Sequence, residues 1–595
     1  MWRRVTMARM GSEGAQKVAD RVLGALRQVG IVLAGAAAVW LVWALALSAW
    51  ARLVAPRSAG ESAWYVSGMH RWGDALPDRM ALVVTVIAVV LIAAMAYSIW
   101  RGRTDRDLAA TPAGAAGVAA LLVVAYVSQG IPAFYRRVMD SAPVTTALPL
   151  GVASWWLCLA GAAATFLAAR AFPRMERGAV KLLAVGAAIA VVVAAVVTVG
   201  ALRAGDDGRF VDSSTAAATD VPAIPTALGK RTFTVSVPDA FADKDVSVYD
   251  IDSAGAGFAV YQHGRITGYG SDGKERWHYA RTGPAEIGVN GMRVVDNGAT
   301  VVAFIDGGLV GLDAVTGAQL WASGDEALGA AVRGRYRAAT GPLIVGWNDE
   351  RIWTRYDSRT GRVLWSVPAP HLGCGITEPI VTASGVVSTV QCEDGKVWLS
   401  VLDPETGQIG WDTVLAEQKI DPKAPIDERY LKIVARPANG IGVFVSMLGS
   451  GTPAEVRYAD IVHRTVSPLP ADGRLAESYG PSDDFVVWYL DDRATRLTLF
   501  GADGRQRCQL PDGLEPARST VPSRRVDQPA YVAFPDTLVL ADRGAGGSLR
   551  TFDAKTCAQT GAVPAQSVVG LVPSPGAVLV LRGEGKTLQV DGYTA

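Results

Sequence analysis

One short motif, repeated at a near-constant interval, constrains the fold of this chain more than any other feature. Copies run over 268–277 (GYGSDGKERW), 311–321 (GLDAVTGAQLW), 356–365 (YDSRTGRVLW) and 402–411 (LDPETGQIGW). In each copy a tight turn closes on Gly, and a Trp stands four residues after that Gly. The four Trp residues are 44, 44 and 46 residues apart. A fixed period of this length is typical of repeat architectures and falls in the range of four-stranded propeller blades.

The residue types in the motif favour the last hairpin of a blade. Asp caps a turn with its own side chain, and Gly supplies a backbone conformation that other residues resist. The Val, Leu and Trp on either side are strand formers. The alternative is a set of unrelated Thr-Gly hairpins in a β-sandwich.

The distribution of apolar residues divides the chain into two regions. Half of the 595 residues are hydrophobic, and those in 1–203 are mainly Ala, Val, Leu and Trp. From about residue 205, short apolar runs alternate with Gly, Asp, Asn and Pro turns. The net charge is +1 and no Lys/Arg-rich tract lies outside the membrane flanks, so no nucleic-acid partner is expected.

The first region predicts a five-helix transmembrane domain over 31–203, after a cytoplasmic segment at 1–30. The five apolar runs are 31–55, 80–100, 111–131, 148–172 and 180–202. None carries an Asp, Glu, Lys or Arg in its middle. Proton and ion pathways need such groups, so a transporter is disfavoured. A helical anchor in the bilayer, or a docking surface for another membrane protein, is favoured.

Basic residues set the expected orientation. With a cytoplasmic N-terminus, the inner segments hold twelve Lys or Arg against five in the outer loops. An odd number of spans then places the residues after Leu202 outside the plasma membrane. Before the first span, Val18, Val22, Leu26 and Val29 recur at helical spacing. This fits either an amphipathic helix on the inner leaflet or an extension of the first span.

The second region predicts an all-β propeller over 230–595, joined to the membrane domain by a linker at 204–229. Seven blades are expected at about 246–279, 292–323, 329–368, 373–414, 429–468, 478–511 and 530–563. The remaining strands, 568–572, 577–581 and 587–590, lack a fourth, which 232–237 supplies. Pairing the two chain ends closes an eight-bladed ring and removes its open edges. Seven blades is the alternative.

The motif resembles the PQQ-type propeller repeat of the quinoprotein dehydrogenases over roughly 230–595, most clearly in its first four copies. In that family the Trp of one blade docks against the Gly of the next. The resemblance therefore implies that Trp277 packs on Gly317, Trp321 on Gly361, and Trp365 on Gly407, with Trp411 in the same structural role. The layout of five spans and a propeller also resembles the membrane-bound quinoprotein glucose dehydrogenases.

An enzymatic alternative follows from this resemblance: a PQQ-dependent sugar or alcohol dehydrogenase that passes electrons to quinone. Such enzymes have larger propellers, often a vicinal Cys-Cys ring, and a catalytic Asp with calcium-binding Glu and Asn. This chain has no Cys-Cys pair. Its candidates lie at turn-forming Asn-Gly and Asn-Asp pairs; they are Asp296, Asn297, Asn348, Asp349 and Glu350. A non-catalytic relative with the same repeat, and of similar size, is the propeller lipoprotein that scaffolds outer-membrane protein insertion.

Four of the five cysteines lie in the propeller region, where oxidation is expected outside the membrane. Cys374 and Cys392 fall on neighbouring strands of the fourth blade, which favours a cross-strand disulfide. Cys508 stands where other copies carry Trp, and Cys557 where they carry Gly. Since these positions touch in the resembling family, the resemblance implies a Cys508–Cys557 disulfide between the sixth and seventh blades. The alternative is two unpaired buried thiols.

Other chemistry is sparse. The five His lack metal-ligand spacing, and no phosphate-binding or nucleophile motif occurs. We therefore expect a non-enzymatic membrane protein of a bacterial cell envelope, whose propeller binds a protein partner or an envelope polymer. No cofactor is expected; PQQ and calcium belong to the enzymatic alternative. The excess of Arg over Lys, with abundant Ala and Gly, indicates a GC-rich genome such as that of an actinobacterium.

Overall fold

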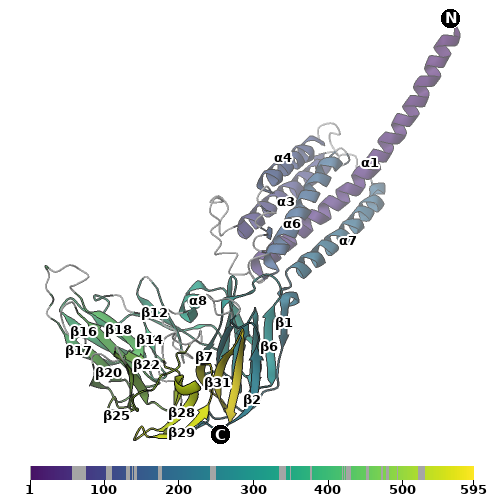
Figure 1. Cartoon of the computed structure of the whole chain (residues 1–595). Helices are drawn as coiled ribbons and strands as arrows, with labels where there is room; N and C mark the ends of the chain where they lie inside the picture. The colour runs from purple at the N-terminus through teal and green to yellow at the C-terminus, as the bar shows by residue number, and fades with distance from the viewer. Residues whose placement is uncertain are drawn as a thin grey trace. The chain divides into compact units, whose positions relative to one another are not determined.

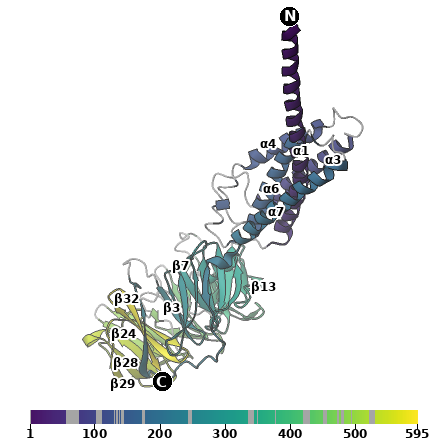
Figure 2. The ribbon, with the colours of Figure 1, turned by 90° about the vertical axis from the view of Figure 1, so that its right-hand side faces the viewer.

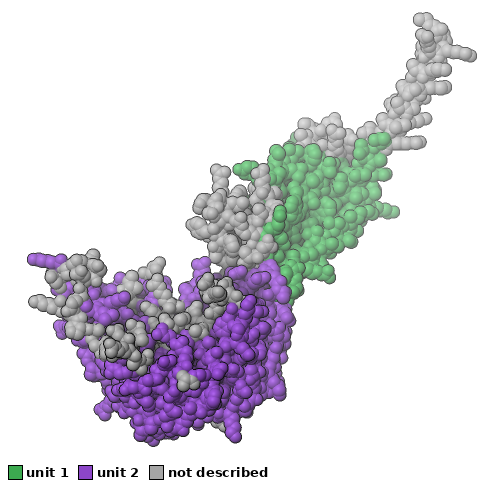
Figure 3. Space-filling view, viewed as in Figure 1, with its two compact units in different colours: residues 1–210 green, residues 211–595 purple. Residues whose placement is uncertain are grey.

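The chain forms two compact units, residues 1–210 and 211–595 (Figure 3). The first is helical, and the second is built from eight β-sheets. The computed structural model describes residues 2–594 except 56–75, 102–109, 129–130, 132–134, 137–138, 140–143, 170, 172–176, 242–248, 334–342, 349, 376–377, 419, 421–422, 424–429, 450–454, 471–473, 477–480, 492–493 and 520–528.

Apolar helices make up the first unit (Figures 1 and 2). The main ones are α1 (Trp2–Leu53), α3 (Leu76–Arg101), α4 (Ala110–Ser128), α6 (Ala147–Ala168) and α7 (Val180–Ala204). Leu41, Val84 and Leu91 are fully buried between them, while Val86 and Val192 are exposed on the outside. Helices that are apolar on both their inner and outer faces are typical of a membrane domain.

Four of these helices are long and apolar enough to span a membrane, within the described residues, rather than the five predicted. They are Gly24–Leu53, Met80–Arg101, Ala147–Ala168 and Val180–Ala204. The span predicted at 111–131 falls on α4, whose apolar stretch, Pro112–Tyr126, is shorter. A helix needs about 20 apolar residues to cross a ~30 Å hydrocarbon core. Glycine in α4 serves packing instead: a Cβ on Gly117 would lie 3.0 Å from Cβ of Phe166 on α6.

α1 is one continuous helix from Trp2 to Leu53, so the segment before the first span extends that span. This is the second of the two predicted alternatives. Within the membrane-type region, α1 packs closely against α7, because a Cβ on Gly35 or on Gly186 would collide with the backbone of the facing helix. Nε1 of Trp43 on α1 donates a hydrogen bond to Oγ1 of Thr198 on α7 (3.0 Å). Small residues and interhelical hydrogen bonds are the contacts that join helices in lipid.

The second unit is an eight-bladed propeller, as predicted, and the seven-bladed alternative is wrong (Figure 1). The first blade contains β3 (Tyr249–Ala254), β4 (Gly257–Gln262), β5 (Arg265–Gly270) and β6 (Glu275–Arg281), with β1 (Val211–Ser214) added beside β6. The second contains β7 (Ile287–Val295), β8 (Thr300–Ile305), β9 (Gly308–Asp313) and β10 (Gln319–Ser323). The third contains β11 (Ile344–Trp347), β12 (Ile352–Tyr356) and β13 (Val363–Pro368). The fourth contains β14 (Ile380–Val381), β15 (Val386–Gln391), β16 (Lys396–Leu402) and β17 (Ile409–Glu417).

The remaining four blades follow in chain order. The fifth contains β18 (Lys432–Pro437), β19 (Gly442–Leu448), β20 (Glu455–Asp460) and β21 (Thr465–Leu469). The sixth contains β22 (Arg474–Ala476), β23 (Phe485–Asp491), β24 (Ala494–Phe500) and β25 (Gln506–Gln509). The seventh contains β26 (Tyr531–Ala533), β27 (Thr537–Asp542), β28 (Ser548–Asp553) and β29 (Gln559–Pro564). The eighth contains β30 (Val568–Ser574), β31 (Ala577–Glu584), β32 (Thr587–Thr594) and β2 (Lys230–Val237).

The expected linker at 204–229 is in part a strand, which corrects the prediction. β1 pairs with β6 from Val211↔Arg281 to Ser214↔His278, so the first blade has five strands. Oγ of Ser214 lies 2.8 Å from Nδ1 of His278, and Oε1 of Glu275 lies 2.8 Å from the same nitrogen. β1 pairs through polar side chains and lacks the alternating apolar pattern from which a strand is normally predicted, so the sequence carries no sign of it.

The predicted start of the third blade, at residue 329, is also wrong, because this residue lies in a short helix, α8 (Glu326–Arg333). Oδ1 of Asp325 caps the helix by accepting the N–H of Ala327 (2.8 Å). Leu328 and Val332 lie on its buried face. The described part of this blade therefore has three strands.

The ring closes where the two ends of the propeller sequence meet. β2 pairs with β32 from Lys230↔Thr594 to Val237↔Leu588, as predicted. The segment before β2 also contacts the second blade, where N of Ala216 donates a hydrogen bond to O of Thr316 (2.9 Å). A further bond, from N of Gly576 to O of Ala223 (3.0 Å), ties it to the eighth blade. The segment thus crosses the seam of the ring.

A buried carboxylate joins the strands at this seam. Asp591 on β32 is 1% exposed and accepts hydrogen bonds from Nε of Arg582 on β31 and Oγ1 of Thr234 on β2, both at 2.6 Å. Burial by itself raises the pKa of Asp591, but these hydrogen bonds and the charge of Arg582 outweigh burial and hold the pKa below its usual value. Ionised Asp591 therefore stabilises the closed ring.

Replacing Asp591 with Asn is expected to lower the unfolding free energy of the propeller at pH 7 by about 1.5–3 kcal/mol, as for loss of hydrogen bonds to a charged group. Because the folded-state pKa lies below the unfolded value, this contribution is present above the unfolded pKa and is lost as the pH falls through the folded pKa. The difference from wild type should therefore shrink below about pH 4.

Denaturant unfolding of the detergent-solubilised chain at pH 7 and pH 3 measures this difference. Asp536→Asn is the matched control, since the Asp536 side chain is 81% exposed, and it should leave stability unchanged. A loss for Asp591→Asn that is equally large at both pH values would contradict the assigned role of the charge.

Candidate functional site

The repeated motif forms the hairpin before the last strand of a blade. In the second blade, Oδ1 of Asp313 accepts the N–H groups of Val315 (3.1 Å) and Thr316 (2.9 Å), and Gly317 has a φ of 73°. The same acceptor pattern recurs at Asp357, Asp403 and Asp553. The positive φ is the physical reason that Gly recurs at the end of the turn.

Each of the first three motif Trp residues packs against the turn of the next blade. Trp277 lies over Gly317, where a Cβ would come within 2.6 Å of its Cγ, and its Nε1 donates to O of Ala314 (2.9 Å). Trp321 lies over Gly361 in the same way.

The pattern continues into the fourth blade. Nε1 of Trp321 donates to O of Ser358 (2.8 Å). Trp365 lies over Gly407 and donates to O of Pro404 (2.9 Å). The three pairs are the ones that the resemblance implied. Trp411 is half-buried against the apolar core shared by the fourth and fifth blades.

The fifth blade keeps the turn under a different sequence, which sequence reasoning missed. Oδ1 of Asp460 accepts the N–H groups of Val462 (3.0 Å) and His463 (2.9 Å). Arg464 occupies the place of Gly with a φ of 55°. In this blade other residues replace both the Gly and the Trp of the motif. The one feature from which the turn could have been predicted is Asp460, four residues before Arg464.

Other side chains take the place of Trp elsewhere in the ring. The ring of Tyr458 lies over Gly504 of the sixth blade, and its hydroxyl donates to O of Ala502 (2.8 Å). Burial raises the pKa of Tyr458, so the hydroxyl keeps the proton that it donates. At the seam, Phe233 on β2 covers Gly273 of the first blade.

A disulfide makes the contact between the sixth and seventh blades. Cys508 and Cys557 are bonded with Cα atoms 5.7 Å apart, so this prediction is confirmed and the unpaired-thiol alternative is wrong. Cys557 has a φ of 57°, like the Gly that it replaces. Sγ of Cys508 lies 3.9 Å from O of Ala554, which is three residues before the turn end. The carbonyls that accept from the indole nitrogens occupy the same position in the second, third and fourth blades.

A pocket of about 650 Å³ lies among the third, fourth and fifth blades. Arg351 lines it from the turn before β12, and Glu393 lines it from the turn before β16. The motif hairpins follow these two strands, so the pocket and the motif hairpins lie at opposite strand ends. Its apolar lining comes from Ile380, Val390, Leu431, Ile433 and Ala435, and its polar lining from Arg351, Glu378, Thr389, Gln391, Glu393 and Tyr430. A volume of roughly 300–1,000 Å³ with mixed lining is typical of binding sites.

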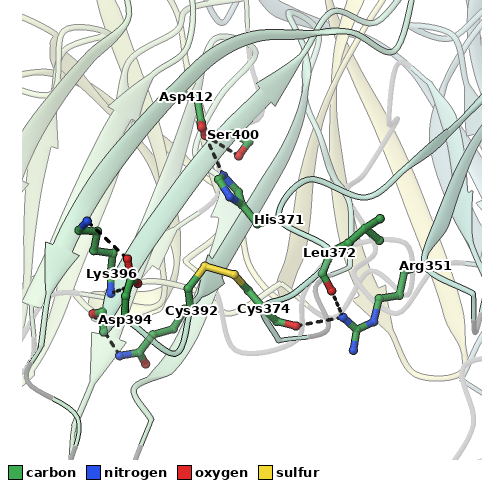
Figure 4. The surroundings of a disulfide bond; sticks show 11 residues. Arg351, His371, Leu372, Cys374, Cys392, Asp394, Lys396, Ser400 and Asp412 are labelled. Atoms are coloured by element: carbon green, nitrogen blue, oxygen red, sulfur yellow. Dashed lines mark hydrogen bonds and ion pairs between the residues drawn. A yellow bond between two sulfur atoms is a disulfide. The ribbon is translucent and has the colours of Figure 1, made fainter.

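Cys374 also lines this pocket. Figure 4 shows its disulfide with Cys392. The Cα atoms of the two residues are 4.5 Å apart, which confirms the predicted bond, but neither cysteine lies in a strand: Cys374 is in a turn before β14, and Cys392 follows the end of β15. Nη1 of Arg351 donates to O of Cys374 (3.0 Å) and to O of Leu372. Arg351 thereby holds the cysteine loop of the fourth blade against the third blade.

His371 lies between this disulfide and Asp412 in Figure 4. Its Nε2 is 3.2 Å from Oδ1 of Asp412, and its ring stacks on Trp398 with centroids 4.8 Å apart. A ligating nitrogen of His371 and the sulfur atoms of Cys374 and Cys392 all lie within 4.8 Å of one another.

The residues considered for PQQ chemistry are placed in separate turns. Asp296 and Asn297 form the turn between β7 and β8, where Oδ2 of Asp296 accepts from Oγ of Ser358 (2.9 Å). Oδ1 of Asn348 accepts the N–H of Ile352 (2.9 Å) in the turn between β11 and β12, at the opposite end of β12 from Ser358. Glu350 is exposed, and Asp349 lies outside the described residues.

These features define the class of protein: an eight-bladed propeller of PQQ-type repeats that follows membrane-type helices. Two overlapping stretches, 183–345 and 262–438, match a family model described as outer membrane protein assembly factor BamB. No curated protein matches the sequence.

Several solved structures match this chain at low identity. BamB from Moraxella catarrhalis is 15% identical, covers 62% of this chain and 100% of its own, and has a TM-score of 0.36. The WD40 domain of SCAP from fission yeast is 10% identical, with coverages of 61% and 98% and a TM-score of 0.32. Quinohemoprotein alcohol dehydrogenase from Comamonas testosteroni is 10% identical, with coverages of 49% and 64% and a TM-score of 0.28.

Replacing Trp321 with Ala is expected to lower the unfolding free energy by about 3–5 kcal/mol, as for other buried aromatic side chains. Trp347→Ala is the matched control, because Trp347 belongs to the same domain but is 37% exposed, and it should cost much less. Denaturant unfolding of the solubilised protein compares the two. Equal losses would show that Trp321 is not packed between blades.

Proposed function

We propose that this protein is a non-catalytic binding module of a bacterial cell envelope. Its helices anchor it in the plasma membrane, and its propeller binds a protein partner on the outer side. The observation that carries the proposal is that the motif hairpins and the pocket lie at opposite ends of the strands. The motif side chains are used for contacts between blades, whereas the mixed polar and apolar pocket adjoins turns at the opposite end of the strands.

The two disulfides support an extracytoplasmic propeller. Disulfides persist in oxidising compartments and are rare in the cytosol. Both Cys374–Cys392 and Cys508–Cys557 lie in the second unit. This argument does not depend on the number of membrane spans.

The pocket among the third, fourth and fifth blades is the surface that we assign to the partner. Tyr430 and Arg351 line the pocket. Tyr and Arg are enriched among the residues that dominate binding energy at protein interfaces. The adjacent apolar side chains would be covered by a partner loop, while Glu378 and Glu393 give the site polar contacts that select its orientation.

A photo-crosslinking residue in place of exposed Glu393 tests this assignment in native membranes. We expect a discrete crosslinked partner, and we expect its yield to fall at least tenfold when Tyr430 is also changed to Ala. The matched control is the same crosslinker in place of Lys555, an exposed residue in the motif turn of the seventh blade. The same adduct from both positions, or none from Glu393, would contradict the proposal.

The enzymatic alternative makes a different prediction, namely oxidation of sugars or alcohols when PQQ and calcium are supplied. We expect no dye-linked turnover from the purified full chain, because Asp296, Asn297 and Asn348 build two separated turns. Bound quinone absorbance after desalting, together with turnover, would contradict a non-catalytic role. A PQQ-loaded dehydrogenase assayed in parallel shows that the reagents are active.

A further inference from the structure

The two disulfides of the propeller differ in their surroundings. Cys374 and Cys392 are both half-buried, and Cys374 lines the pocket, whereas in the second bond Cys508 is half-buried and Cys557 is 3% exposed. Thiol–disulfide exchange requires that an attacking thiolate reach a sulfur atom. The Cys374–Cys392 bond is therefore the one that an external thiol reaches more readily.

Opening this bond would leave two thiols next to His371. Within the described part of the chain, this is the one group of three His, Cys, Asp or Glu residues whose ligating atoms all lie within 4.8 Å of one another. Oδ1 of Asp412, which also accepts from Oγ of Ser400 (2.7 Å), lies 3.2 Å from Nε2 of His371. A carboxylate on one ring nitrogen is the arrangement that orients histidine ligands of zinc.

We propose that reduction of Cys374–Cys392 creates a site for a thiophilic divalent metal, zinc(II), held by the two thiolates and the imidazole of His371. Zinc binds such ligands tetrahedrally, with Zn–S of about 2.3 Å and Zn–N of about 2.0–2.1 Å. Two thiolates on one zinc are then roughly 3.8 Å apart, so the two sulfur atoms move apart once the bond between them is broken. Cys374 lines the pocket, and we assign the fourth position to a water molecule that enters from that side.

The chemistry balances with an external dithiol as the reductant. One thiolate of the dithiol attacks a sulfur of the disulfide and displaces the other sulfur, and its second thiol then releases the first cysteine while the reductant becomes a disulfide. Two electrons and two protons pass to Cys374 and Cys392. Metal binding then releases the two thiol protons to solvent.

The test uses the full chain in detergent with Cys158→Ser, which removes the free thiol buried in α6. The protein is treated anaerobically with a dithiol, reduction is verified by mapping alkylated peptides, and cobalt(II) is added as the probe. We expect one equivalent of cobalt with thiolate charge-transfer absorbance, displaced by zinc(II). The Cys508→Ser/Cys557→Ser variant should behave identically, and Cys374→Ser should lose the absorbance.

Two further variants distinguish a built site from a chance pair of thiols. His371→Ala and Asp412→Asn should weaken cobalt binding by at least tenfold, the latter because second-shell partners typically contribute 10–100-fold. Far-ultraviolet and near-ultraviolet circular dichroism of the oxidised variants checks that each is folded. The proposal is overturned if Cys374–Cys392 resists reduction in the folded protein, if reduced protein binds no cobalt, or if His371→Ala binds as tightly as wild type.

Discussion

The propeller depends on one contact, in which a side chain from the outer or next-to-outer strand of a blade covers the turn of the next blade. Where the side chain is Trp, its indole donates to the carbonyl three residues before the turn end, at Ala314, Ser358 and Pro404. Cys508 approaches the corresponding oxygen of Ala554. Because a single repeat cannot bury its own faces, stability comes from these junctions, and the ring needs a closing junction, which Phe233 provides over Gly273.

The chemistry of the contact varies while its geometry stays the same. The turn position takes a positive φ whether it holds Gly317, Arg464 or Cys557. A non-Gly residue in that conformation is strained, so it is retained where another contribution offsets the strain. At Cys557 the offset is a covalent bond to the preceding blade.

The sequence was sufficient to predict the first four blades because they repeat the turn and its Trp at a near-constant period, and the later blades because strands and turns alternate. The same logic predicted the closing strand, since three strands at the C-terminus lacked a fourth, and it predicted the Cys508–Cys557 bond through the resembling family. Prediction failed where local signals were weak or misleading. β1 has four residues with no apolar alternation, and α8 stands where a strand was expected.

The pocket could not be predicted, because its residues come from segments far apart in the chain. Arg351, Cys374 and Tyr430 belong to three blades, and only the curvature of the ring brings them to one cavity. Length also limited the membrane prediction: the apolar stretch Pro112–Tyr126 of α4 is too short to qualify as a span by itself. The Gly residues that dilute this stretch serve helix packing, as Gly117 does against Phe166.

The most direct test of an extracytoplasmic propeller is the redox state of its cysteines in the living cell. Intact cells are quenched with acid, free thiols are alkylated in denaturant, and disulfides are then reduced and labelled with a second reagent before peptide mapping. The account predicts that Cys508 and Cys557 carry the second label and are linked to each other before reduction, while Cys158 carries the first. Free thiols at both Cys508 and Cys557 in freshly quenched cells would contradict it.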